Sequence, residues 1–193
     1  MEPVRDREPE TGFLDKIRSI ATNIGAVLIF DEISAGFRLT TGGAHLQYNI
    51  EPDMAVFAKA ISNGYPMAAI IGRRAVMQAA QNTFVSSTSW TERIGPVASL
   101  ATISKHRREH VARHLIRVGE LVQAGWQTAS QRAGLPIDIR GISPLAHFSI
   151  DCDRSQAAHT IFTQEMLERG FLANNSFYAT YAHQDHHVDS YME

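Results

Sequence analysis

Two residues that directly follow apolar segments of the chain could carry out chemistry. Asp31 follows the segment 26–30, and Lys59 follows the segment 54–58. Both segments are typical of buried strands, and open parallel sheets bind ligands beyond the carboxyl ends of their strands. A carboxylate at such a position could hold a metal, orient a histidine or pair with a protonated ring nitrogen, or it could simply cap a turn. An apolar approach to Lys59 favours a neutral, nucleophilic amine, although a lysine whose stem covers apolar surface is the simpler interpretation.

The two residues together predict a more specific chemistry than either does alone. If both strands end at one edge of a sheet, Asp31 and Lys59 face one pocket. Catalysis with pyridoxal phosphate needs this combination, because a lysine reacts with the aldehyde carbon while an acid keeps the pyridine nitrogen protonated. The polar segment 86–89, Ser-Ser-Thr-Ser, offers hydroxyl and backbone N–H groups that suit a phosphate. A plain turn is the other interpretation of that segment.

The elements that must position these residues follow from the hydrophobic pattern. Apolar residues recur at three- and four-residue steps from Phe13 to Ile24, which predicts a helix ending at Gly25. The segment 26–30 then predicts a strand buried on both faces, as in a parallel sheet. Further strands are expected at 53–58, 67–72 and 83–87, with a short helix at 74–81. This part of the chain is therefore predicted to be α/β.

The remainder of the chain predicts a long helix and a second, smaller module. Residues 95–133 carry one apolar face and form the expected connecting helix. Gly134–Pro136 interrupts this pattern and marks the expected boundary between a mostly parallel domain, 1–133, and a small α+β domain, 134–193. Within the small domain we expect strands in 137–150, a helix at 157–168, short strands in 171–182 and a last helix after His183.

The composition excludes several classes of protein. Apolar residues make up 44% of the 193 residues and charged residues 20%, with a formal net charge of −2, which is ordinary for a chain that forms a core. No apolar run is long enough for a membrane helix, and the first residues do not resemble a secretory signal. The charge is too balanced for a dedicated nucleic-acid-binding protein. A single cysteine fits a reducing compartment, so a cytoplasmic location is expected.

Several histidines raise the question of a metal site. His106, His110 and His114 are spaced four residues apart on the expected helix, but the arginines beside them disfavour a cation, so a solvated helix face is the preferred interpretation. A second group, His183, His186 and His187, lies where the last helix is expected to begin. No metal is expected at either group. Cys152 lies between two aspartates, which disfavour its thiolate, so no catalytic role is expected for it.

A series of short motifs resembles the class III pyridoxal-phosphate aminotransferases. The motifs occur in the order and with the approximate spacing of that family, and they resemble most its branch that contains glutamate-1-semialdehyde aminomutase and sugar-modifying relatives. The resemblance extends from residue 1 to about residue 189. The motifs are Met1-Glu-Pro-Val4, Gly12-Phe-Leu14, Leu28-Ile-Phe-Asp-Glu-Ile33, Gly36-Phe-Arg38, Gly42-Gly43, Pro52-Asp53, Lys59-Ala-Ile-Ser-Asn-Gly-Tyr-Pro66, Met166-Leu-Glu-Arg-Gly170 and 183–189.

This resemblance implies a fold, a cofactor and roles for individual residues. It implies the C-terminal part of a fold-type I pyridoxal-phosphate enzyme. Asp31 would pair with the pyridine nitrogen, while Lys59 would form the Schiff base and move the proton. Thr88 would bind the phosphate, usually that of the neighbouring subunit, which implies a homodimer. Glu32 and the segment 36–38 would have structural or peripheral roles. The implied substrates are small amino and keto or aldehyde compounds.

Family members also carry a domain half that would precede Met1, so the resemblance implies that this chain is a C-terminal fragment. Both transamination and intramolecular amino exchange stay open, because the segment 176–179 looks shorter than in the aminomutase. Two other interpretations of the chain remain. The first is a non-catalytic remnant that folds or dimerises without the cofactor. The second is an ATPase fragment, because the segment 27–32 also fits a Walker B strand, although no Walker A loop is present.

Overall fold

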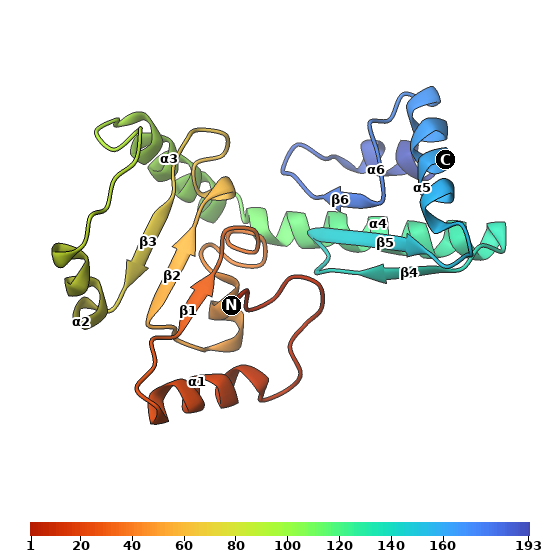
Figure 1. Cartoon of the computed structure of the whole chain (residues 1–193). Helices are drawn as coiled ribbons and strands as arrows, with labels where there is room; N and C mark the ends of the chain where they lie inside the picture. Colours follow the sequence, from red (N-terminus) through yellow and green to blue (C-terminus); the bar gives the residue numbers. More distant parts are fainter. The chain divides into compact units, whose positions relative to one another are not determined.

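The structure, a computed structural model, describes residues 1–193 in two compact units, 1–112 and 113–193 (Figure 1). Each unit contains a three-stranded sheet with its own helices. Residues 134–193 were expected to form the small domain. The second unit contains these residues and most of the helix that precedes them. None of the helices is both long and apolar enough to cross a membrane.

The first unit is built on a mixed sheet in the order β1-β2-β3. β1 and β2 run parallel with Asp31 opposite Val56, whereas β3 is antiparallel to β2. Figure 1 shows the three strands side by side, with α1 near the start of β1. The elements are α1 (Phe13–Asn23), β1 (Ile29–Asp31), β2 (Met54–Phe57), β3 (Ala69–Gly72), α2 (Arg74–Met77) and α3 (Ile94–Arg108), with 3₁₀ turns at Ala44–Tyr48, Lys59–Ile61 and Gln78–Asn82.

The helix and the first two strands confirm the expected elements, but the burial of β1 differs from the prediction. Leu28 and Phe30 are buried, in a core cluster with Leu14 and Ile50. Val27 and Ile29, which point to the other face, are 48% and 42% exposed. The prediction of a strand buried on both faces is therefore wrong for this structure, because no layer of the chain covers that second face.

Asp53 joins three of these elements. Its Oδ2 accepts a hydrogen bond from the backbone N–H of Leu28 at 2.8 Å and another from Nη1 of Arg18 at 2.8 Å. The Leu28 N–H, followed by the Arg18 guanidinium, holds the pKa of Asp53 below its ordinary value. This buried carboxylate therefore ties α1 and the start of β1 to the start of β2.

Two expected elements of the first unit are corrected. Residues 83–87 form no strand, and Phe84 in that segment is 95% exposed, so no neighbouring strand pairs with it. The expected helix 95–133 is interrupted, since α3 ends at Arg108 and α4 (Val111–Ala133) begins three residues later. His110 lies between them with a φ of 51°, a left-handed conformation that a continuous helix cannot contain.

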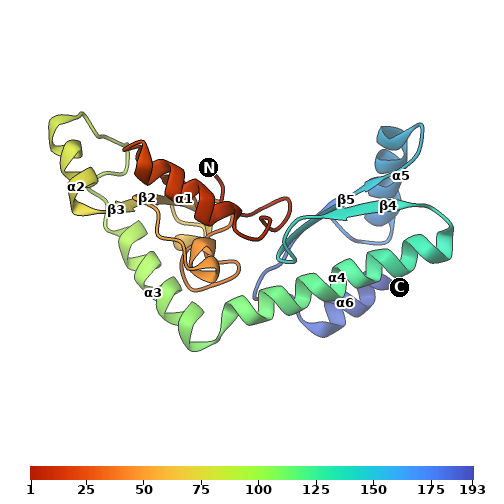
Figure 2. The ribbon, with the colours of Figure 1, turned by 90° about the horizontal axis from the view of Figure 1, so that it is seen from below.

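The second unit packs α4 and α6 beside an antiparallel sheet in the order β4-β5-β6 (Figure 2). The rings of Trp126 in α4 and Phe148 in β5 are 4.8 Å apart between their centres. Trp126 also donates a hydrogen bond from Nε1 to the hydroxyl of Tyr191 in α6 at 3.0 Å. The ring of Phe162 in α5 packs against the ring of Phe148, with 5.3 Å between ring centres. The remaining elements are β4 (Ile137–Arg140), β5 (Leu145–Ile150), α5 (Ser155–Glu168), β6 (Ser176–Tyr178) and α6 (Asp185–Met192).

The apolar face of α4 explains why this helix belongs with the second unit. Val118 and Val122 are completely buried. Gly119 lies so close to the backbone at Ser143 and Pro144 that a Cβ at this position would clash with it. A helix can approach a loop this closely only where it has no side chain. Gly134, with a φ of 62°, then ends the helix where the sequence predicted an interruption.

Candidate active site

Asp31 and Lys59 lie at the same edge of the first sheet. β1 ends at Asp31, and the parallel strand β2 ends two residues before Lys59. Asp31 is half-buried, and its Oδ1 accepts a hydrogen bond from the N–H of Ile33 at 2.9 Å. This Asx turn fixes the carboxylate through one oxygen and leaves Oδ2 for another partner. The expectation that both residues follow strands of one sheet edge agrees with this topology.

Lys59 has a strained backbone and a defined side-chain contact. Its φ is 52°, and it begins the 3₁₀ turn Lys59–Ile61 after an extended Ala58. A left-handed conformation costs a residue with a side chain about 1–3 kcal/mol and persists where the surrounding structure requires it, most often at functional sites. The residue is exposed, but its Nζ donates a hydrogen bond to Oγ of Ser34 at 2.6 Å.

Ser34 is a site residue that the sequence analysis missed. Its side chain is buried in the turn after β1, and its Oγ also accepts a hydrogen bond from Nη1 of Arg5 at 3.3 Å. The signal that could have identified it is its position three residues after Asp31, at the same strand end. The structure thus brings the lysine amine to the turn that begins at the aspartate.

Glu32 anchors this turn from inside the protein. Its side chain is 0% exposed, and its carboxylate accepts three hydrogen bonds from the 3₁₀ turn Ala44–Tyr48. The donors are the N–H of Ala44 at 2.8 Å, the N–H of His45 at 3.1 Å and the ring Nδ1 of His45 at 2.7 Å. A buried carboxylate with this many partners fixes the backbone that carries it. The contacts are structural, as the resemblance implied for Glu32.

The side chain of Phe37 packs the same turn against the core of the first unit. Its φ is 62°, and its ring contacts Phe57 of β2 and His106 of α3, each at 5.8 Å between ring centres. Gly36 before it lies against the carbonyl of Glu32 and the ring of Phe57, so a Cβ at this position would clash with both. The segment 36–38 therefore connects the site turn to β2 and α3.

Thr88, the expected phosphate ligand, is not brought to Asp31 and Lys59 within this chain. It is exposed in the turn 88–91, after the irregular segment 83–87. No hydrogen bond joins Thr88 to either residue. The implied role at the phosphate of a neighbouring subunit therefore stays a prediction.

His106 is buried, which corrects the expectation of a solvated histidine face. Its Nε2 lies 2.9 Å from the carbonyl oxygen of Phe37, and its Nδ1 lies 2.8 Å from Oγ1 of Thr41. A neutral ring that donates from Nε2 and accepts at Nδ1 satisfies both contacts. Burial lowers the pKa of His106 below its ordinary value, and the hydrogen bond to Phe37 only partly opposes this effect. His114, in the other unit, lies with Nε2 2.8 Å from the carbonyl oxygen of His183.

We expect acid to destabilise the first unit through His106. Because its folded pKa is lower than that of an unfolded histidine, about 6.5, the unfolded state takes up the proton first as the pH falls. The contribution to the free energy of unfolding is thus complete above pH 6.5 and is lost as the pH falls through the folded pKa. Amide hydrogen exchange of residues 37–41 between pH 8 and pH 5 measures this loss. His106→Gln, which keeps a donor for Phe37, should show a weaker dependence, and identical curves would contradict the assignment.

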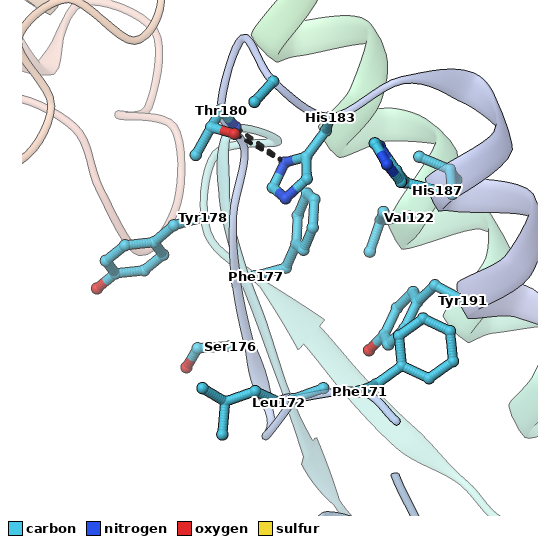
Figure 3. A pocket seen from close by; sticks show the side chains of 13 residues that line it. Val122, Phe171, Leu172, Ser176, Phe177, Tyr178, Thr180, His183, His187 and Tyr191 are labelled. Atoms are coloured by element: carbon cyan, nitrogen blue, oxygen red, sulfur yellow. Dashed lines mark hydrogen bonds between the residues drawn. The ribbon is translucent and has the colours of Figure 1, made fainter. Parts of the chain in front are cut away.

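The second unit contains a cavity of about 500 Å³ beside β6 (Figure 3). Its wall is mainly apolar and includes Val122, Phe171 and Phe177. The ring of His183 lies over Phe177, with 5.0 Å between ring centres, and its Nδ1 accepts a hydrogen bond from the N–H of Thr180 at 3.0 Å (Figure 3). No three metal-binding side chains converge here or elsewhere in the chain. Unlike the edge of the first sheet, this cavity does not combine an amine with a carboxylate.

The sequence matches the profile of the family described as aminotransferase class-III over residues 6–193. The chain belongs to this family. It is 30% identical to the 3-aminobutyryl-CoA aminotransferase of Cloacimonas acidaminovorans, covering 91% of this chain and 42% of that protein. It is also 30% identical to the glutamate-1-semialdehyde 2,1-aminomutase of Desulfitobacterium hafniense, covering 96% of this chain and 47% of that protein. This aminotransferase chain therefore spans about half the length of the curated relatives it matches.

Solved structures confirm the expected fold. The FumI protein of Sphingopyxis sp. MTA144, determined in a pyridoxal-phosphate form, matches with a TM-score of 0.93 at 24% identity. The match covers 100% of this chain and 48% of that one. The acetylornithine aminotransferase of Elizabethkingia anophelis matches with a TM-score of 0.84 at 17% identity, and the match covers 99% of this chain and 51% of that one. The class-III aminotransferase chain thus has part of the fold-type I pyridoxal-phosphate transferase fold. The same residues are covered by the family profile, so a Walker B role for 27–32 has no support.

The residues at the edge of the first sheet fit the cofactor of this pyridoxal-phosphate-dependent family. An amine and a half-buried carboxylate are the two groups that the cofactor's aldehyde and ring nitrogen need. Asp31 has one carboxylate oxygen for a ring N–H, while Lys59 presents a primary amine from an exposed side chain. The other cofactor contacts are not identified within this chain.

Proposed function

We propose that this class-III aminotransferase chain supplies the lysine and the aspartate of a pyridoxal-phosphate site for an aminotransferase or aminomutase. The observation that carries the proposal is the position of Asp31 and Lys59 at the ends of adjacent parallel strands. The curated relatives include both reaction types. The aminotransferase and the aminomutase described above are each 30% identical to this chain. The proposed substrates are a small amino compound and a keto or aldehyde compound.

Each side chain has a distinct role in the proposed reaction. Lys59 would hold the cofactor through Nζ, and its amine would move the proton of the substrate carbon that carries the amino group. The carboxylate of Asp31 would hold a proton on the ring nitrogen through a hydrogen bond. The cofactor supplies the electron sink that makes this carbon acidic. Thr88 is proposed to reach the phosphate of a second subunit in a homodimer.

Borohydride trapping tests the proposal directly. The full chain is incubated with pyridoxal phosphate, reduced with borohydride and mapped by peptide mass spectrometry. The chain has three lysines, Lys16, Lys59 and Lys105, so a selective label is easy to assign. We expect label on Lys59 well ahead of the two others. Label spread evenly over the three, or no label, would contradict the proposed site.

Asp31→Asn is expected to weaken cofactor binding and to slow proton removal from the substrate. Asparagine has nearly the same shape but no charge, so the ring nitrogen loses the partner that keeps it protonated. Loss of a charged hydrogen-bond partner typically costs about 1.5–3 kcal/mol, which corresponds to roughly 10- to 150-fold in cofactor affinity. Titration of the absorbance of pyridoxal phosphate measures this affinity. Unchanged affinity and an unchanged rate would show that Asp31 does not face the ring nitrogen.

A second candidate is a chain that folds without binding the cofactor. What favours it is the position of Thr88, which is exposed and has no hydrogen bond to Asp31 or Lys59 within this chain. The trapping experiment separates the two candidates. A folded chain without selective label on Lys59 supports the second.

A further inference from the structure

We infer that Ser34 is a positioning residue that holds the amine of Lys59 at the edge of the first sheet, ready to react with an aldehyde. The inference rests on the proposed function, since it concerns the same lysine. The observation behind it is the hydrogen bond of 2.6 Å from Nζ of Lys59 to Oγ of Ser34, which joins the ends of two different strands. Neither residue type nor spacing had indicated this contact in the sequence.

Lys59 needs such a partner because its own surroundings do not restrain the side chain. The residue is exposed, and a lysine stem has four rotatable bonds, so an unanchored amine would spread over many rotamers in water. The left-handed backbone at Lys59 fixes where the stem begins, but it does not fix where the amine ends. A hydrogen bond as short as 2.6 Å restricts the amine to one small region.

Ser34, in contrast, is rigidly placed. It is 7% exposed, in the turn that follows β1. The residue two positions before it, Glu32, is fully buried and fixed by its hydrogen bonds to Ala44 and His45. A buried, anchored hydroxyl holding an exposed, mobile amine is the arrangement expected of a positioning residue.

The hydroxyl of Ser34 receives hydrogen bonds from two basic side chains. Arg5 donates through Nη1 at 3.3 Å, and the same nitrogen lies 3.2 Å from Oε1 of Glu2. The longer distance and the competing carboxylate make Arg5 the weaker of the two partners. Ser34 is therefore committed mainly to Lys59 and does not serve a backbone group of its own turn, as a capping serine would.

Ser34→Ala tests the inference in the full chain. Pyridoxal phosphate is added, borohydride is added after increasing times, and the label on Lys59 is compared with that on Lys16 in the same sample. We expect the initial labelling rate of Lys59 relative to Lys16 to fall about tenfold, because an amine that is no longer held in place is less often positioned for reaction. Ser34→Thr, which keeps the hydroxyl, should restore much of the preference. An undiminished preference in Ser34→Ala overturns the inference.

Ser99→Ala is the matched control for a purely structural effect. Ser99 is also buried, at 4% exposure, and its hydroxyl bonds within α3 to the carbonyl of Gly95 at 2.9 Å. Loss of this hydroxyl should leave the labelling rate of Lys59 relative to that of Lys16 at the wild-type value. An equal fall in Ser99→Ala and Ser34→Ala would show that any loss of a buried hydroxyl disturbs Lys59, which would overturn a specific role for Ser34.

A second measurement distinguishes failure of this inference from failure of the proposed function. Reductive methylation with ¹³C-formaldehyde labels the three lysine amines and the α-amine of Met1 without any cofactor, and nuclear magnetic resonance follows the four signals. The Lys59 signal should shift in Ser34→Ala while the Lys16 signal stays fixed, and an unshifted Lys59 signal overturns the inference. If wild-type Lys59 shows no preference for pyridoxal phosphate but its methyl signal responds to Ser34, the contact stands and the proposed function fails.

Discussion

Lys59→Ala is expected to abolish selective trapping of pyridoxal phosphate and to reduce turnover by at least about 10⁴-fold in any assembly where this chain is active. The variant removes both the nucleophile and the group that moves the proton, and no second lysine can replace it, because the other lysines are Lys16 and Lys105. Peptide mapping after borohydride reduction and a transamination assay measure the two effects. Turnover retained near the wild-type rate would refute the assignment of Lys59.

Two further variants separate chemistry from charge and folding. Lys59→Arg keeps a cation that can still donate to Ser34, but a guanidinium does not condense with an aldehyde at neutral pH, so it should be as inactive as the alanine variant. Lys16→Ala, at an exposed position of α1, should leave trapping at Lys59 unchanged. Because the side chain of Lys59 is exposed, neither Lys59 variant should change the urea midpoint of unfolding appreciably.

Glu32→Ala is expected to lower the free energy of unfolding of the first unit by about 3–5 kcal/mol, because several buried hydrogen-bond donors lose their acceptor and a cavity opens. The variant leaves the N–H groups of Ala44 and His45 and the ring of His45 without their acceptor. It also opens a cavity at a completely buried position. Such a loss is large beside the total stability of a typical domain, about 5–15 kcal/mol. Urea unfolding followed by circular dichroism measures it.

Matched variants identify the source of that loss. Glu32→Gln keeps the shape and one acceptor oxygen, so it should cost less than the alanine variant. Glu51→Ala removes an exposed carboxylate whose nearest ion pair, with Arg73, has a distance of 3.6 Å, and it should produce no measurable change. If Glu32→Ala were as mild as Glu51→Ala, the buried hydrogen bonds would not be what holds the site turn.

The local elements could be predicted because their signals lie within a few residues. The three- and four-residue steps from Phe13 and the glycine at 25 predicted α1 and its end, and Gly25 indeed has a φ of 69°. The break between α3 and α4 could not be predicted in this way. The segment 104–110 is polar throughout and contains no glycine or proline that would mark the end of a helix. The reason for the break is that α3 packs with the first unit while α4 packs with the second.

Burial was harder to predict than secondary structure. The segment 26–30 is apolar on both faces and therefore predicted a strand covered on both sides. In this structure only the face with Leu28 and Phe30 is covered. His106 shows the opposite error, since the arginines beside it in the sequence predicted a solvated face. The ring in fact turns inward to the carbonyl of Phe37, a residue 69 positions away.

The sequence by itself determined the family of this protein and two residues of its candidate site. Asp31 and Lys59 were identified by their types and by the apolar segments before them, which are local properties. Only the tertiary structure decided which groups hold these residues in place. Ser34 reaches Lys59 across 25 positions of the chain, and Glu32 reaches the turn at Ala44 across 12. Hydrogen bonds of this kind depend on where strands end in space and on how side chains turn, and no periodicity in the sequence records either.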